Sequence, residues 1–140
     1  MKIRRLEIED IERGYIRLLR QLTECEEVSK EEMKEFCEKL NEEHQIWILE
    51  DGEEVVGTGT LFIERKIIHG MGKVGHIEDI VIDERYRGKK LGEMMIRHLT
   101  EKSKEMGCYK VILDCMESKK GFYEKCGFKE KGIQMALYFQ

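Results

Sequence analysis

Several features that mark other protein classes are missing from this 140-residue sequence. It contains no proline, which by itself indicates no function, and no apolar run approaches the length of a transmembrane helix. The first ten residues, MKIRRLEIED, lack the apolar stretch of a signal peptide. The five cysteines include no C-x-x-C pair, which predicts neither a zinc site nor a disulfide framework. We therefore expect a protein of a reducing compartment, the cytoplasm, without a bound metal.

A large excess of charge of one sign is also missing. The 25 Lys and Arg residues against 29 Asp and Glu residues give a net charge of −4, which predicts neither a nucleic-acid nor a membrane partner. Hydrophobic residues make up 41% of the chain, enough for a core beneath a heavily charged surface. Because no repeat, linker or low-complexity segment divides the sequence, we expect one domain over residues 1–140 that buries about two thirds of its unfolded surface.

Hydrophobic periodicity predicts the element order β-α-α-β-β-β-α-β-α-β. Strands are expected at residues 2–8, 46–49, 55–63, 77–82, 111–113 (as a central strand) and 128–139. Helices are expected over residues 11–22, 29–40, 91–106 and 119–126. Ser29 and Glu32 form a capping-box pattern, Asp51-Gly52 indicates a hairpin, and Gly127 is placed to end a helix.

The most informative pattern lies between residues 75 and 99. A buried strand at 77–82 is followed by a tight basic turn at 85–90 and an amphipathic helix from Leu91. Such a turn leaves backbone N–H groups unpaired at the positive end of the helix dipole, where they bind anionic oxygens, above all phosphates. The turn is neither a Walker loop nor a G-x-G-x-x-G motif. The alternative is an exposed loop that enters a helix.

This turn resembles the pyrophosphate-binding turn of the GNAT superfamily of N-acetyltransferases, whose pattern is Q/R-x-x-G-x-G/A. The pattern falls on Arg87, Lys90 and Gly92, so Lys90 replaces the middle glycine, which a backbone in the α region tolerates. The element order matches the superfamily over essentially the whole chain. The resemblance implies an α/β (α+β) fold with a mixed central sheet of about six to seven strands flanked by about four helices.

Five segments resemble one subfamily, whose members acetylate the amine of glucosamine 6-phosphate with acetyl-CoA on the route to UDP-N-acetylglucosamine. These segments lie at residues 21–24, 63–69, 76–81, 107–110 and 121–128. The resemblance implies acetyl-CoA as co-substrate, a small-molecule acceptor and a homodimer. Two departures exist: Lys119 stands where asparagine is common, and residues 134–139 lack an arginine that some members place near the phosphate. Acetylation of another amine (peptide, polyamine or aminoglycoside) and a non-catalytic acyl-CoA-binding module are the alternatives.

The resemblance places the cofactor along the basic turn and the short helix near residue 123. The backbone from Gly88 to Glu93 would wrap the CoA pyrophosphate, and Lys89 and Lys90 would add ionic contacts. The implied cofactor-binding residues are Ile80, Ile82, Arg87, Gly88, Lys89, Lys90, Leu91, Gly92, Glu93, Lys119, Tyr123, Glu124 and Lys125.

Four residues are implied in catalysis: Tyr123, Asp114, Ile80 and Glu78. The Tyr123 hydroxyl would stabilise or protonate the departing thiolate, with packing in the core as the alternative. The backbone N–H of Ile80 would stabilise the oxyanion of the tetrahedral intermediate. Asp114 would orient the amine or help remove its proton, or else cap the loop after its strand. Because no cysteine shows a paired base, we expect direct attack by the amine in a ternary complex.

An acidic pair, Glu78-Asp79, interrupts the apolar strand at 77–82. Side chains alternate along a strand, so the two carboxylates share a role only if a bulge intervenes, and a structural salt bridge is the alternative. The resemblance implies that this segment lines the sugar site. The implied substrate-binding residues are Thr23, Lys66, Ile67, Ile68, His69, Glu78, Asp79, Ile80, Tyr109, Lys110 and Asp114.

Overall fold

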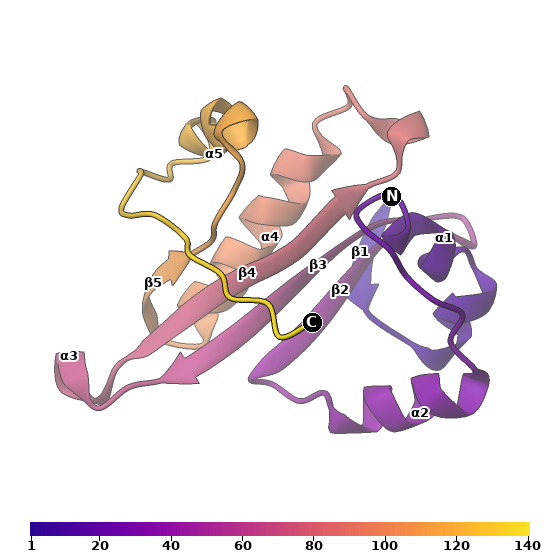
Figure 1. The fold of residues 1–140 in the computed structure, drawn as a ribbon, viewed down its shortest axis with the longest axis horizontal. Helices are drawn as coiled ribbons and strands as arrows, with labels where there is room; N and C mark the ends of the chain where they lie inside the picture. Colours follow the sequence, from indigo (N-terminus) through magenta and orange to yellow (C-terminus); the bar gives the residue numbers. More distant parts are fainter.

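A computed structural model describes all residues from 1 to 140, with one five-stranded sheet in the order β1-β2-β3-β4-β5 at its centre (Figure 1). The strands are β1 (Lys2–Arg5), β2 (His44–Asp51), β3 (Glu54–Arg65), β4 (Lys73–Ile82) and β5 (Cys108–Ile112). Strands β1 to β4 run antiparallel to their neighbours, whereas β5 runs parallel to β4. The sheet is therefore mixed, and the fold class expected from the sequence is confirmed.

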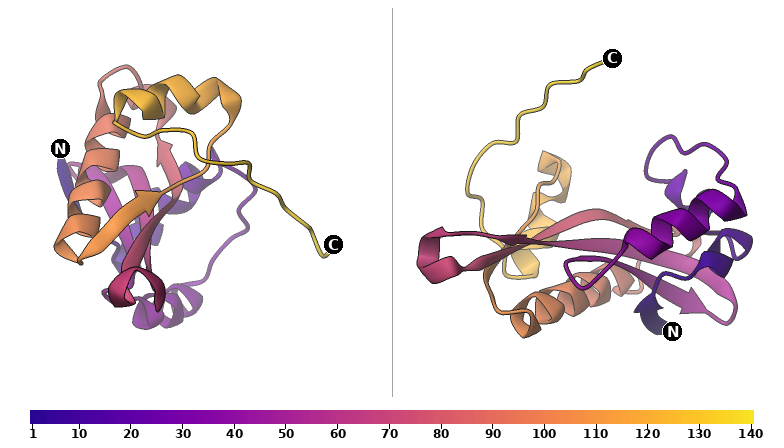
Figure 2. Two further views of the ribbon diagram at one scale, coloured as in Figure 1. Left: turned by 90° about the vertical axis from the view of Figure 1, so that its left-hand side faces the viewer. Right: turned by 90° about the horizontal axis from the view of Figure 1, so that it is seen from below.

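Helices cover both faces of the sheet. They are α1 (Tyr15–Leu19), α2 (Lys30–Lys39), α3 (Ile68–Met71), α4 (Leu91–Glu105) and α5 (Lys120–Lys125), with 3₁₀ turns at Ile8–Glu12, Glu84–Tyr86 and Glu117–Lys119. Seen along the sheet, α2 lies on one face and α4 on the other (Figure 2). None of these helices combines the length and the apolar character that a membrane span needs.

The core consists of two clusters, one on each face of the sheet. Because side chains alternate along β2, Leu49 packs in a cluster with Leu99 of α4, whereas Ile48 packs in a second cluster with Met33 of α2. All four side chains are almost completely buried. The functional residues therefore rest on a sheet that is fixed from both sides.

Several local predictions are confirmed. The Glu32 N–H donates to the Ser29 hydroxyl at 3.1 Å and the Ser29 N–H donates to the Glu32 carboxylate at 3.0 Å, which completes the capping box of α2. Gly52, with φ of 63°, closes the β2–β3 hairpin, and Gly127, with φ of 97°, follows the end of α5. Strands β2, β3 and β4 extend beyond their expected bounds, and α4 ends one residue early.

The first strand is shorter than predicted. It was expected at residues 2–8 but ends at Arg5. Glu7 and Asp10 form a capping box, in which the Glu7 N–H donates to the Asp10 carboxylate at 2.8 Å, and this box starts a 3₁₀ turn. The local hydrogen bonds of the cap thus replace the strand.

The prediction of one continuous helix over residues 11–22 is wrong. Gly14 has φ of 94°, a left-handed conformation that ends the 3₁₀ turn before α1 begins. The helical segment α1 then lasts only from Tyr15 to Leu19, and Leu22 beyond it is 41% exposed.

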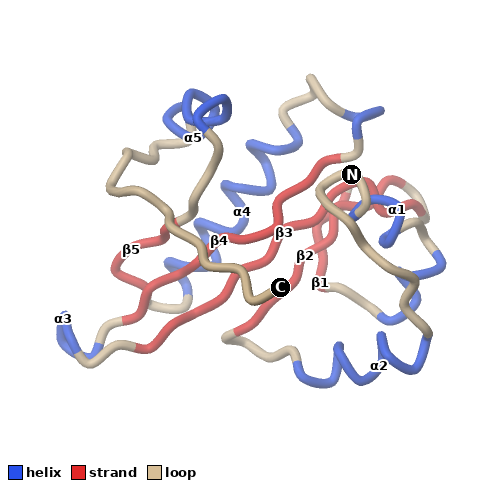
Figure 3. The backbone as a smooth tube through the Cα atoms, viewed as in Figure 1, coloured by secondary structure: helices blue, strands red, loops and turns tan.

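The end of the chain forms no strand, although residues 128–139 were expected to be one. The segment has no regular secondary structure and projects from the sheet on the side of α2 (Figures 2 and 3). As a result β5 is an edge strand rather than the central strand predicted at 111–113, and the sheet has five strands instead of about six to seven. A strand needs a hydrogen-bonded neighbour, and within one chain this segment has none.

Candidate active site

A β-bulge in β4 brings the acidic pair to one face of the sheet. Thr58 pairs with Val81 and Thr60 pairs with Glu78, so two residues of β4 oppose one residue of β3. Asp79 lies in the bulge with φ of 50°, a left-handed conformation that Asp tolerates better than most residues. The bulge that was the condition for a shared role of the two carboxylates is therefore present.

The bulge shifts the alternation of side chains along β4 by one residue. Ile77 and Ile80, three positions apart, both pack on the α4 side, whereas Val81 packs on the side of α1 and α2. Asp79 lines a cavity on that second side, and Glu78 and Asp79 are both exposed. Neither carboxylate takes part in a salt bridge or hydrogen bond, so the alternative of a structural salt bridge does not hold.

A third carboxylate, Asp114, follows β5 and adds to this acidic cluster. Although Glu78 is exposed as a residue, partial desolvation of its carboxyl group raises its pKa, and the charges of Asp114 and Asp79 raise it further. Asp114 accepts a hydrogen bond from Gln134 Nε2 at 2.8 Å. Uncompensated carboxylates that repel one another form a suitable environment for an amine cation.

Strands β4 and β5 pair only over the first half of β4. Their register runs from Lys73 opposite Cys108 to His76 opposite Ile112, after which the chain leaves β5 toward α5. In Figure 1, β4 and the chain that follows β5 diverge from this point. The edge of β4 that contains Ile80 has no strand partner there, which leaves backbone groups for a ligand.

The basic turn offers unpaired N–H groups at the start of α4. No hydrogen bond within the chain uses the N–H of Leu91, Gly92 or Glu93, and no side chain caps the helix. Gly88 has φ of 83° and Lys90 has φ of 61°. The expectation that Lys90 would lie in the α region is therefore wrong: the position adopts the left-handed conformation that favours glycine.

Residues of this turn contact neighbouring parts of the chain. Arg87 Nε donates to the carbonyl of Ile82 at 3.3 Å, and Lys89 Nζ lies 5.1 Å from the centre of the Tyr86 ring. A Cβ atom on Gly92 would lie 3.3 Å from Cζ of Phe122, so α4 and the helix α5 approach closely here. Turn and helix thus meet, as a cofactor site that spans both would require.

Tyr123 lies on α5, where it is half-buried against the core cluster that contains Leu49 and Leu99. Its ring packs edge-on against Phe122, with centroids 5.0 Å apart, and against Phe128 at 6.1 Å. Burial raises the pKa of its phenol, and the charges of Cys115 and Cys126 add to the effect. The hydroxyl is therefore protonated at neutral pH, and it has no hydrogen-bond partner in the chain. The exposed candidates Lys119, Glu124 and Lys125 lie on or next to the same helix.

A second group of candidates lies at the tip of the β3–β4 hairpin. The His69 ring is 4.4 Å from that of Tyr109, and Lys110 Nζ lies 5.8 Å from the Tyr109 ring centre. Lys66 Nζ contacts the Glu64 carboxylate at 3.2 Å. The neighbouring Ile67 and Ile68 are more than half exposed.

The structure does not bring all substrate candidates together within one chain. Lys73, at the hairpin tip, and Asp79 are six residues apart on β4, which corresponds to about 20 Å. Thr23 lies after α1, whose position in Figure 1 is at the opposite end of the sheet from α3. The candidates therefore divide into an acidic group near Asp79 and a basic, aromatic group near His69.

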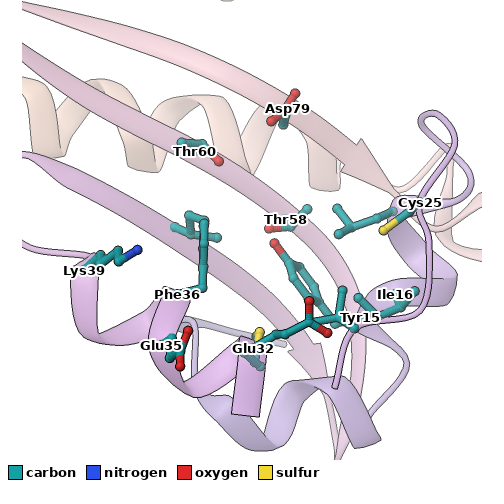
Figure 4. Close-up of a pocket in the computed structure, with 14 residues that line it drawn as sticks. Tyr15, Ile16, Cys25, Glu32, Glu35, Phe36, Lys39, Thr58, Thr60 and Asp79 are labelled. Atoms are coloured by element: carbon teal, nitrogen blue, oxygen red, sulfur yellow. The ribbon is translucent and has the colours of Figure 1, made fainter. Parts of the chain in front are cut away.

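Sequence reasoning missed a cavity next to Asp79. It measures about 540 Å³ and lies between the sheet and helices α1 and α2 (Figure 4). Tyr15, Thr58 and Thr60 contribute hydroxyl groups to its wall, and burial raises the pKa of Tyr15 to about 12. The polar pair Thr58 and Thr60 in an otherwise apolar strand was the available signal. No group of three or more His, Cys, Asp or Glu side chains is placed to hold a metal ion.

Comparison with known proteins gives consistent matches. Residues 8–128 match the model of the acetyltransferase (GNAT) family. A probable glucosamine 6-phosphate N-acetyltransferase 2 of Oryza sativa subsp. japonica is 47% identical, over 99% of this chain and 88% of that protein. The glucosamine 6-phosphate N-acetyltransferase of Arabidopsis thaliana is 46% identical, over 99% and 96%. The crystal structure of the glucosamine-6-phosphate N-acetyltransferase from Arabidopsis thaliana superposes with a TM-score of 0.96, at 46% identity, over 99% of this chain and 98% of that chain.

Proposed function

The chain belongs to the acetyltransferase (GNAT) family, and from this we propose that it acetylates the amine of glucosamine 6-phosphate with acetyl-CoA. The products would be N-acetylglucosamine 6-phosphate and CoA. The observation that carries the proposal is identity of 46–47% over 99% of the chain to relatives named for this activity. We propose a cytoplasmic reaction on the route to UDP-N-acetylglucosamine.

The turn before α4 is the proposed site of the CoA pyrophosphate. Its free N–H groups at Leu91, Gly92 and Glu93 point along the helix dipole, which favours anionic oxygens. The unpaired edge of β4 beyond His76 would hold the acyl-bearing arm of acetyl-CoA. Turn and edge are joined in sequence, so one extended cofactor can contact both.

Catalysis would proceed by direct attack. The acidic cluster of Glu78, Asp79 and Asp114 would attract and orient the amine, whose nitrogen attacks the thioester carbonyl carbon after losing its proton. The N–H of Ile80 would stabilise the oxyanion. As the C–N bond forms, the C–S bond breaks, and the protonated hydroxyl of Tyr123 would stabilise or protonate the departing thiolate.

Recognition of the phosphate requires the second group of candidates. Lys66, His69 and Lys110 can supply cations, and charge-assisted hydrogen bonds contribute about 1.5–3 kcal/mol each. Because these residues are separated from Asp79 along β4, one chain alone does not surround a glucosamine 6-phosphate molecule. A second copy of the chain would supply the missing half of the site.

The exposed C-terminal segment supports this homodimer. Ile133, Met135, Leu137 and Phe139 recur with a period of two, and each is at least 80% exposed. Such an apolar row costs free energy in water and is typical of a surface that another protein covers. Removal of residues 132–140 should convert a dimer to a monomer in light scattering and abolish sugar acetylation. A monomeric full-length protein that is active would refute the dimer.

Acceptor specificity provides the main test of the proposed function. We expect kcat/KM for glucosamine 6-phosphate to exceed that for glucosamine by at least about tenfold, which corresponds to only about 1.4 kcal/mol. Thiol release from acetyl-CoA would be measured with both sugars and with a lysine peptide. Equal rates on the two sugars would reject phosphate recognition, and preference for the peptide would indicate another acceptor class. Binding of acetyl-CoA without turnover of any amine would indicate a non-catalytic module.

A further inference from the structure

The α1–α2 loop, residues 20–28, has little backbone hydrogen bonding of its own. Arg20 Nε donates to the carbonyl of Cys25 at 2.8 Å, and Arg20 Nη2 contacts the Glu27 carboxylate at 2.9 Å. The N–H groups of residues 24–28 make no hydrogen bond within the chain. A segment with so few backbone hydrogen bonds opens at low cost in free energy. Its position therefore depends on contacts with the rest of the molecule.

Gln21 joins the start of this loop to the segment that leads into the basic turn. Its Oε1 accepts a hydrogen bond from the N–H of Glu84 at 2.9 Å, across 63 residues of sequence. That N–H belongs to the first residue of a 3₁₀ turn and has no other partner in the chain. The preceding N–H, of Asp83, donates to the carbonyl of Val56 at 2.8 Å, which fixes the segment to β3. Gln21 thus attaches the loop to a point that is anchored on the sheet.

An ion-pair bridge runs beside this hydrogen bond. Arg17 of α1 and Arg85 of the 3₁₀ turn both contact the same oxygen of Glu54, each at 2.6 Å. Both arginine side chains are more than half exposed, and exposed ion pairs contribute little to stability. The bridge reaches α1 but not the loop. Gln21 is therefore the residue through which the loop itself is held.

The two segments that Gln21 joins serve different substrates in the proposed reaction. Thr23, a proposed sugar-binding residue, lies two residues after Gln21, and its N–H donates to the carbonyl of Leu19 at 3.1 Å. Glu84 lies seven residues before Leu91, where the N–H groups proposed to bind the CoA pyrophosphate begin. A direct contact between the sugar side and the cofactor side helps to hold the amine and the thioester in a reactive orientation.

We propose that Gln21 is a positioning residue that fixes the α1–α2 loop, and with it Thr23, relative to the cofactor turn. The inference rests on the proposed function, because it assigns this loop to the acceptor. When CoA occupies the turn, the segment before the turn loses freedom, and the hydrogen bond from Glu84 to Gln21 restricts the loop as well. Bound CoA should therefore strengthen sugar binding, and the sugar should strengthen CoA binding by the same factor.

Calorimetry of glucosamine 6-phosphate, with and without saturating CoA, tests the coupling. We expect sugar binding in the wild type to be at least about fivefold tighter with CoA. In Gln21→Met, which keeps the side-chain length but removes the accepting oxygen, the two affinities should agree within about twofold, and the affinity for CoA alone should not change. Glu26→Gln, at an exposed residue of the same loop whose side chain makes no hydrogen bond, is the matched control and should keep the wild-type ratio. The same ratio in wild type and Gln21→Met would overturn the inference.

Hydrogen exchange separates failure of this inference from failure of the proposed function, because it needs no acceptor. CoA alone should slow exchange of the amides of residues 24–28 in the wild type and in Glu26→Gln, but not in Gln21→Met, as measured by rapid-mixing mass spectrometry. Unchanged exchange in the wild type, or slowing that persists in Gln21→Met, would overturn the inference even if glucosamine 6-phosphate is acetylated. Slowing that depends on Gln21, in a protein that does not bind glucosamine 6-phosphate, would support the positioning role and reject the proposed acceptor.

Discussion

Gly59 and Ile80 lie so close across the β3–β4 ladder that a Cβ atom on Gly59 would stand 2.6 Å from Cδ1 of Ile80. Gly59 is the β3 residue between Thr58 and Thr60 and therefore opposes the bulge. Because Gly59 has no side chain, the side chain of Ile80 has room to pack over β3 at this position. The position of the Ile80 N–H, proposed to stabilise the oxyanion, thus depends on a glycine in the neighbouring strand.

Gly59→Ala should reduce activity by more than its loss of stability explains. Overpacking of a core costs about 1–3 kcal/mol, and here the displaced atom belongs to Ile80 itself. We expect kcat to fall at least tenfold with little change in the KM for acetyl-CoA, as measured by thiol release. Gly75→Ala, where a Cβ would meet Ser103 Oγ at 2.6 Å, is the matched control and should cost stability with a smaller effect on kcat. Equal kcat in both variants would remove the positioning role of Gly59.

Lys90→Gly should stabilise the protein. A left-handed conformation costs a non-glycine residue roughly 1–2 kcal/mol, part of which is offset by the greater freedom of glycine in the unfolded chain. We expect the free energy of unfolding in urea to rise by about 0.5–1 kcal/mol. Lys90→Ala removes the charge but keeps the left-handed strain, so it should not stabilise. If Lys90→Ala were the more stable variant, charge rather than backbone strain would dominate at this turn.

Asp83 should make stability pH-dependent in the acid range. Its carboxylate is nearly completely buried and accepts hydrogen bonds from Arg85, which lowers its pKa from 3.8 to about 2. Because the native pKa is the lower one, the stabilisation is present above pH 5 and is lost as pH falls toward 2. The difference corresponds to roughly 2 kcal/mol at neutral pH. Urea unfolding between pH 7 and pH 2.5 measures it.

Asp83→Asn should be less stable at pH 7 and show a flatter acid profile. The neighbouring Glu84 makes no side-chain hydrogen bond or ion pair, so Glu84→Gln should preserve the wild-type profile. Parallel acid profiles for wild type and Asp83→Asn would show that other carboxylates determine acid stability.

The sequence predicted best those parts of the fold that local chemistry determines. The capping box of Ser29 and Glu32 and the turn at Gly52 depend on residues within a few positions of one another, and both are present. Helix α4 depends on a strong apolar period, and it begins at the expected Leu91.

Where the prediction failed, competing local or non-local interactions decided. The cap at Glu7 ended β1 early, and Gly14 divided the first helix. In both segments the hydrophobic pattern alone predicts a longer element. The alternating row from Ile133 to Phe139 correctly indicates strand propensity, but no strand of the same chain pairs with it. Periodicity reports what a segment can form, and pairing decides whether it does.

The candidate site shows the same limit. Residues near in sequence, such as those of the basic turn, are found together, whereas the cavity formed by Tyr15, Thr58 and Asp79 joins three separate elements. At Lys90 the sequence shows that lysine replaces the middle glycine of the motif, but the backbone conformation predicted for this position was wrong. The roles assigned to individual site residues stay predictions until variants are measured.

Tyr123 allows catalysis and packing to be separated by one atom. Tyr123→Phe keeps the ring contacts with Phe122 and Phe128 and removes a hydroxyl that has no partner in the chain. The free energy of unfolding should therefore change by less than about 0.5 kcal/mol. Tyr86→Phe, which removes a hydroxyl that donates to Asp51 at 2.7 Å, is the matched control and should leave kcat unchanged.

If the Tyr123 hydroxyl stabilises the CoA thiolate, kcat of Tyr123→Phe should fall by about 10²-fold or more, the usual range for a positioned acid. Acetyl-CoA and sugar affinities should barely change, because the interaction is strongest once the C–S bond is breaking. A thiolate that must take its proton from solvent should make the variant relatively more active at lower pH, until protonation of the amine dominates. Full activity at every pH would show that Tyr123 serves packing alone.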